Sequence, residues 1–210
     1  MPVTIELAPR QMATTLTVFD RGGTETSFQV RAFAWSQNDE GADRLAATDE
    51  LLVSPPLGTI PAGGSQIIRL VLRRPPVGRE ASYRVLLDQI PPPPAPGTVR
   101  VALRLSIPVF AEPETRATPH LRWRVDPQGY LIASNDGTRH QTVRNIVLRT
   151  HAGDQLKVEA NVSPYVLPGA TRRWRIVGLA AASALGTTLR LTASTDTGAI
   201  GQPVSVGAAR

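Results

Sequence analysis

The chain has 210 residues, enough for one or two domains with buried cores. No apolar run approaches the roughly 20 residues that a membrane-spanning helix needs. The net charge is +6, but the 22 arginines and the single lysine are scattered along the chain and not clustered with aromatic residues, so we expect no nucleic-acid partner. The absence of cysteine excludes disulfide bonds and cysteine-ligated zinc.

The first half of the chain predicts an all-β fold. Apolar and polar residues alternate over short segments, and turn signals recur about every ten residues, as expected for strands joined by turns. The predicted strands include residues 3–7, 16–19, 28–35, 67–72, 83–90 and 98–110. Their number and spacing match an immunoglobulin-like β-sandwich.

A second, smaller sandwich is predicted after the linker at residues 112–119. The expected strands are residues 121–125, 130–133, 143–148, 156–160, 172–177, 188–192 and 204–206. Residues 179–185 fit a helical turn or a loop of small residues equally well. The sequence therefore predicts two domains, residues 1–115 and residues 116–210.

The strand at residues 98–110 is unusual because of its length. It follows a proline-rich tract at residues 91–97, which we expect to form an extended surface loop. Side chains alternate across a strand, so one face of this segment is a row of branched aliphatic residues: Val99, Val101, Leu103, Leu105, Ile107 and Val109. Pro108 lacks a backbone N–H, which places that end of the strand at a sheet edge. Two interpretations compete: the row fills the protein's own core, or it pairs with another chain.

Enzymatic chemistry is not expected. The three histidines are widely separated in sequence, and no nucleotide-binding or nucleophile motif occurs. A set of five acidic residues can be interpreted in two ways, as a metal-binding or acid/base cluster or, more simply, as solvent-exposed charges in loops: Asp39, Glu40, Asp43, Asp49 and Glu50. We therefore expect no metal, no cofactor and no catalytic residue.

Several segments around the long strand resemble one known family. Tyr83 to Pro91 reads YRVLLDQIP and leads through the proline tract into the alternating strand. Upstream, Pro55-Pro56 precedes GGSQIIRL at residues 63–70, and Arg10 ends the first predicted strand. This order and spacing resembles the periplasmic pilus chaperones, the PapD-like family of the chaperone–usher pathway, over about residues 1–115.

That resemblance implies two immunoglobulin-like domains in an L or boomerang arrangement. It implies that the long strand, called G1 in the family, completes the open fold of a pilus or fimbrial subunit, with an outer-membrane usher as the second partner. The donated side chains would be Val101, Leu103, Leu105, Ile107 and Val109. The protein would act in the periplasm after removal of an export signal that this chain does not show. The sequence leaves open whether the free form self-associates to cover its apolar row.

Two further sets of residues follow from the resemblance alone. The family holds the subunit's C-terminal carboxylate with two basic residues; Arg10 matches the first, and Arg116 matches the second if one hinge residue is dropped and arginine replaces lysine. Glu80 and Asp196 match acidic members of an interdomain charge network, with Arg116 or Arg122 as the basic partner. The alternative function is a structural or adhesive surface module such as a pilus subunit. It is disfavoured because the alternating segment lies in mid-chain, ahead of a second domain.

Overall fold

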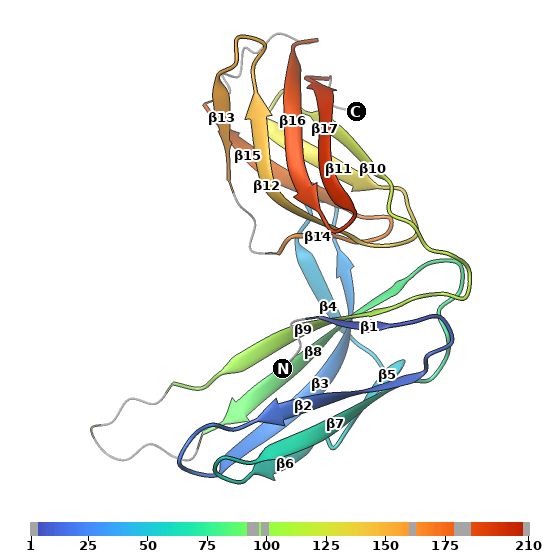
Figure 1. The fold of residues 1–210 in the computed structure, drawn as a ribbon, viewed down its shortest axis with the longest axis vertical. Coiled ribbons are helices and arrows are strands. Elements are labelled where there is room, and N and C mark those ends of the chain that lie inside the picture. The colour runs from blue at the N-terminus through green and yellow to red at the C-terminus, as the bar shows by residue number, and fades with distance from the viewer. Residues whose placement is uncertain (1–3, 92–96, 98–100, 160–162, 179–185, 208–210) are drawn as a thin grey trace. The chain divides into compact units, whose positions relative to one another are not determined.

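The computed structural model describes residues 4–91, 97, 101–159, 163–178 and 186–207, and every regular element in these ranges is a β-strand (Figure 1). The chain divides into two compact units: unit 1 comprises residues 1–35 and 45–116, and unit 2 comprises residues 36–44 and 117–210. Each unit has its own hydrophobic core. The predicted all-β fold of two sandwich domains is confirmed. A search of the described residues finds no helix that could span a membrane.

Unit 1 consists of two sheets that enclose one core (Figure 1). The strands of the first sheet, in spatial order, are β1 (Ile5–Leu7), β9 (Arg104–Ala111), β8 (Ala81–Ile90), β3 (Thr26–Gln37) and β4 (Asp43–Ala47), with β6 (Leu57–Ile60) also paired to β3. The second sheet is β2 (Ala13–Phe19), β7 (Ser65–Leu72) and β5 (Leu51–Ser54). Alternate residues of both sheets point inward, so Leu16, Ile68 and Val85 are fully buried.

The long predicted strand is shorter in the structure. β9 begins at Arg104, and Val99 lies outside the described residues. β8 pairs with β9 along its whole length, whereas β1 pairs in parallel only from Val109 to Ala111. Within the described part of the chain, residues 104–108 therefore have a strand neighbour on one side alone.

Unit 2 is built on one large sheet that curls until its ends meet. The strand order is β10 (Leu121–Val125), β11 (Tyr130–Asn135), β15 (Thr171–Val177), β13 (Gln155–Val158), β12 (Gln141–Arg149), β16 (Thr188–Thr195) and β17 (Gly198–Ser205), and β14 (Tyr165–Val166) also pairs with β12. Val125 forms a bridge to Val206, and the amide of Gly207 donates to the Val125 carbonyl over 3.0 Å. The first and last strands of the sheet are thereby joined around the second core.

The turn between β3 and β4 belongs to unit 2 because a buried arginine holds it there. Arg172 of β15 donates to the carbonyl oxygens of Gly41 and Ser163, both at 2.6 Å, and to Asp43 Oδ1 at 3.1 Å. Burial lowers the pKa of Arg172, an effect that the Asp43 carboxylate opposes. A Cβ at Gly41, whose φ is +81°, would lie 3.0 Å from the Arg172 backbone, so this position requires glycine.

Candidate functional site

The backbone of β9 presents an open hydrogen-bonding edge. Leu103 and Gln89 form a hydrogen-bonded pair, since the Gln89 amide donates to the Leu103 carbonyl over 2.9 Å. Backbone groups alternate in direction along an antiparallel strand, so those of Arg104 and Ser106 point away from β8. The backbone of Pro108 also points away from β8, but it has no N–H to donate and lies where the parallel pairing with β1 begins, so this end of the strand is not the sheet edge that its proline predicts. Arg104 and Ser106, each with an outward N–H donor and C=O acceptor, therefore form a free edge.

The aliphatic row on β9 divides into an exposed part and a buried part. Val101 is 87% exposed and Leu103 57% exposed, while Leu105 is half-buried at the margin of the core. Ile107 is only 4% exposed and Val109 is completely buried, and both belong to the core of unit 1. Of the five predicted donor residues, Ile107 and Val109 are thus enclosed in this conformation by the sandwich and the parallel strand β1, and Val101 and Leu103 are the exposed ones.

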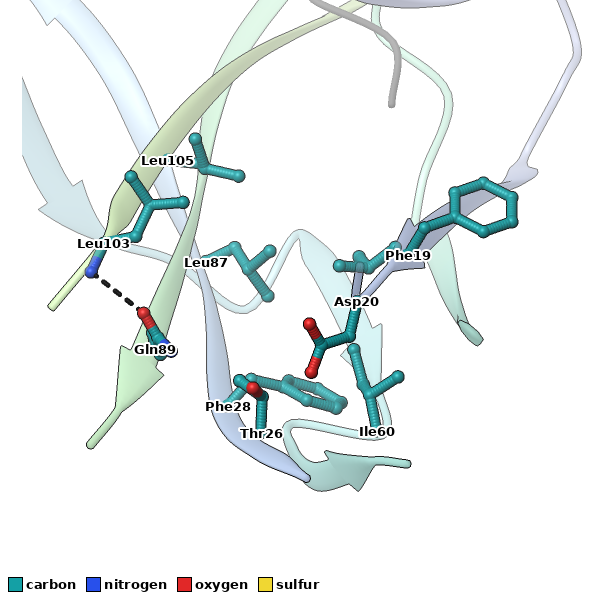
Figure 2. Close-up of a pocket in the computed structure, with 10 residues that line it drawn as sticks. Phe19, Asp20, Thr26, Phe28, Ile60, Leu87, Gln89, Leu103 and Leu105 are labelled. Atoms are coloured by element: carbon teal, nitrogen blue, oxygen red, sulfur yellow. Dashed lines mark hydrogen bonds between the residues drawn. The ribbon is translucent and has the colours of Figure 1, made fainter. Parts of the chain in front are cut away.

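An apolar groove of about 290 Å³ lies beside the exposed part of the row (Figure 2). Leu103 and Leu105 form one wall, and side chains from β2, β3, β6 and β8 form the rest: Val18, Phe19, Phe28, Ile60 and Leu87. The carboxylate of Asp20 lines the same groove, and its pKa is lowered by hydrogen bonds from the Thr26 hydroxyl and the Gly22 amide. The groove is therefore apolar with one negative charge on its lining.

These groove residues were not anticipated from the sequence, because they come from four strands far apart in the chain. Phe19 ends β2 and Ile60 ends β6, and each reads locally as an ordinary strand residue. The available signal was the alternation within each strand, which assigns Val18 and Phe28 to an inward face. Alternation cannot reveal that the two sheets leave a hollow at this end.

Arg10, the first predicted carboxylate anchor, lies in the turn after β1 with a positive φ of 67°. Its guanidinium contacts Glu114, with Nε 3.3 Å from Oε1 and Nη2 donating to Oε2 at 3.3 Å. Both side chains are exposed, so this ion pair contributes about 0–1 kcal/mol. Arg116, the second predicted anchor, is exposed in the same stretch of chain as Glu114.

The two acidic residues of the predicted charge network lie in different units. Glu80 is buried in unit 1, and Asp196 lies in the turn between β16 and β17 of unit 2. Asp196 accepts hydrogen bonds from the amide and hydroxyl of Thr142, at 3.1 and 3.2 Å, and from the side chain of Gln141. Arg122, one candidate basic partner, instead forms an ion pair with Asp136 in its own unit. That pairing lowers the pKa of Asp136 and raises the pKa of Arg122.

The acidic residues considered as a catalytic or metal cluster are separated. Asp39 and Glu40 lie in unit 2, whereas Asp49 and Glu50 lie in unit 1. Asp49 pairs with Arg73 at 3.0 Å. No group of three potential metal ligands occurs within the part of the chain that the structure describes.

Glu50 instead has a structural partner. The Tyr83 hydroxyl donates to Glu50 Oε2 over 3.2 Å. Burial, together with the nearby Glu50 charge, raises the pKa of Tyr83 to about 12. Interpretation of these acids as solvated loop charge was incomplete, because Asp43 and Glu50 each bind a partly or wholly buried side chain.

Comparison with known proteins points to one family. The model of the pili and flagellar-assembly chaperones, PapD N-terminal domain, matches residues 2–117, which is more than half of the chain. No curated protein sequence matches significantly. The fold is similar to that of a chain in the pre-assembly complex of the chaperone CsuC and the tip subunit CsuE, from the archaic chaperone–usher Csu pili of Acinetobacter baumannii. That similarity has a TM-score of 0.70 and 21% identity, and covers 100% of this chain and 98% of the other.

Two further solved structures share the fold. The CupB2 chaperone of Pseudomonas aeruginosa is 15% identical with a TM-score of 0.64, covering 98% of both chains. A chain of the Salmonella enterica complex of the SafA pilin with the SafB chaperone is 18% identical with a TM-score of 0.64, covering 98% of this chain and 93% of the other. The free edge of β9 lies within the residues that the family model matches. This chain therefore belongs to the family of pili and flagellar-assembly chaperones that share the PapD N-terminal domain.

Proposed function

We propose that this protein is a periplasmic chaperone that binds pilus or fimbrial subunits by donor-strand complementation and delivers them to an outer-membrane usher. Residues 1–115, apart from residues 36–44 that belong to unit 2, are the domain that carries the donor strand, and residues 116–210 form the main part of the second domain. One observation carries the proposal: β9 has a free edge at Arg104 and Ser106 beside exposed apolar side chains and an open apolar groove.

The geometry supports addition of a subunit strand at this edge. The outward N–H and C=O groups of Arg104 and Ser106 supply a hydrogen-bond ladder for an incoming strand. Leu103 and Leu105 line the groove and Val101 is exposed just before them in the chain, and a subunit's open core would cover these side chains. Completing their burial stabilises the complex by on the order of 3–6 kcal/mol before the cost of association. Such a complex needs no nucleotide for release, because a better-fitting strand from a neighbouring subunit replaces β9.

Arg10 and Arg116 are proposed to hold the subunit's C-terminal carboxylate. Arg10 is exposed, and its present partner Glu114 is bound through a weak surface ion pair. A carboxylate that binds the planar guanidinium through two hydrogen bonds can displace Glu114 at little cost.

The test compares the same substitution at two leucines of unit 1 that are almost equally exposed. Leu103→Glu places a charge at the groove beside the free edge, whereas Leu57→Glu places it on β6, at a side chain that is 56% exposed and does not line the groove. We expect both variants to fold and only Leu103→Glu to lose co-purification with β-rich secreted proteins encoded beside its gene. Undiminished co-purification of Leu103→Glu would refute strand donation. Ile107→Glu is unsuitable for this test, because it would bury an unpaired charge in the core.

A further inference from the structure

The end of β8 contacts the beginning of β9 through two consecutive side chains. Asp88 and Gln89 are the last but two and last but one residues of β8, and they face opposite sides of the sheet. Each contacts one of the residues that open the donor segment, Arg104 and Leu103 respectively. We call Asp88 and Gln89 the β9 latch.

Asp88 holds β9 from the outer face of the sheet. It lies directly opposite Arg104 in the register, in a pair without mutual backbone hydrogen bonds, where side chains approach most closely. Asp88 Oδ1 accepts from Arg104 Nε, and Oδ2 accepts from Nη2 of Arg31 on β3 at 2.7 Å. Only 15% of the Asp88 side chain is exposed. One carboxylate thus joins three neighbouring strands, and its pKa is lowered chiefly by the bond from Arg104.

Gln89 holds β9 from the inner face, at the groove (Figure 2). Its backbone amide donates to the Leu103 carbonyl at 2.9 Å, and its side-chain Oε1 accepts from the Leu103 amide at 3.3 Å. The side chain thereby continues the hydrogen-bond ladder one residue before β9 begins. Leu103 is fixed through both its backbone donor and its backbone acceptor.

A strand that pairs with only one neighbouring strand is prone to fray at its end and to slip in register. In β9, either change would displace Leu103 and Leu105. A slip by one residue would turn Leu103 and Leu105 to the outer face and bring Arg104 to the groove. The same slip would put Asp88 and Arg104, which lie opposite each other in the native register, on different faces of the sheet and break their contact. The β9 latch therefore acts on the part of β9 that pairs with β8 alone.

We propose that Asp88 and Gln89 are positioning residues that fix the start and the register of β9 and hold Leu103 and Leu105 at the groove before a subunit arrives. The benefit for subunit capture rests on the proposed function, whereas the latch itself is a property of the free protein. An edge fixed in advance spares the complex part of the ordering cost of association.

The test measures amide hydrogen exchange in the free, full-length protein. Asp88→Ala is expected to accelerate exchange of the Leu105 amide, which faces β8, by about tenfold or more, because a charged hydrogen bond is lost. Gln89→Leu should do the same at Leu103, and the conservative variants Asp88→Glu and Gln89→Glu should restore most of the protection. Asp49→Ala, which removes an exposed ion pair with Arg73 in the same unit, is the matched control and should leave Leu105 unchanged.

Two results would overturn the inference. The first is unchanged exchange at Leu103 and Leu105 in the Asp88 and Gln89 variants. The second is equal acceleration at these amides and at Leu70, a core position of the other sheet, since that would show a loss of global stability instead of a loss of position. Neither result depends on a partner protein. A failure of strand donation would appear instead as retained co-purification of Leu103→Glu, so the two failures can be distinguished.

Discussion

The division of the aliphatic row on β9 makes a quantitative prediction for two alanine substitutions four residues apart. Ile107→Ala removes a side chain that is 4% exposed and lies in the core of unit 1, so it should lower the free energy of unfolding by about 2–5 kcal/mol. Leu103→Ala removes a side chain that is 57% exposed, and it should lower that free energy by less than about 1 kcal/mol.

Subunit binding, unlike the stability of the free protein, should be sensitive to Leu103→Ala. Covering the 57% of Leu103 that is still exposed is worth about 1–1.5 kcal/mol, so Leu103→Ala should weaken subunit binding by about tenfold. Chemical denaturation of the free protein measures the first effect, and titration of a subunit that co-purifies with the unsubstituted protein measures the second. Equal destabilisation by the two substitutions, or unchanged affinity of Leu103→Ala, would refute this division of the row.

Three further predictions concern other parts of the chain. Gly41→Ala should destabilise unit 2 by about 1–3 kcal/mol in thermal unfolding, because a Cβ at this positive φ lies against the backbone of Arg172. Tyr83 should ionise near pH 12 in an ultraviolet titration; since its folded pKa is raised by burial and by Glu50, its stabilising contribution is complete below about pH 10 and is lost as the pH rises towards 12. A normal titration of Tyr83 would contradict that environment. Arg10→Ala should change the free energy of unfolding by less than about 1 kcal/mol while weakening subunit capture, and a large loss of stability would show that Arg10 is structural.

The sequence predicts the sandwich strands because their alternation is local. Burial alternates from Arg104 to Ile107 as expected, but residues 107–111 are all buried, because Pro108 and Phe110 on the other face of the strand are covered as well. The pattern cannot distinguish Leu103 from Val109, since burial of Val109 depends on the parallel strand β1, a hundred residues earlier in the chain. Sequence alternation thus identifies the face but not the depth of burial along it.

Charged residues were harder to assign for the same reason. Asp43 and Arg172 are separated by 129 residues, and nothing near either residue shows that they meet. Asp88 lies within the segment that carries the family resemblance, yet its contacts with Arg31 and Arg104 depend on the register of three strands. Register follows from the whole sheet and not from a local motif.

The most direct test of strand donation is amide exchange at the free edge of β9, with and without a bound subunit. In the free protein, the outward amides of Arg104 and Ser106 should exchange quickly, whereas those of Leu105 and Ile107 are bonded to β8 and should exchange slowly. Binding of a subunit should slow exchange at Arg104 and Ser106 specifically. Fast exchange at both amides in a complex shown to be intact would contradict the proposal that this edge receives the subunit's strand.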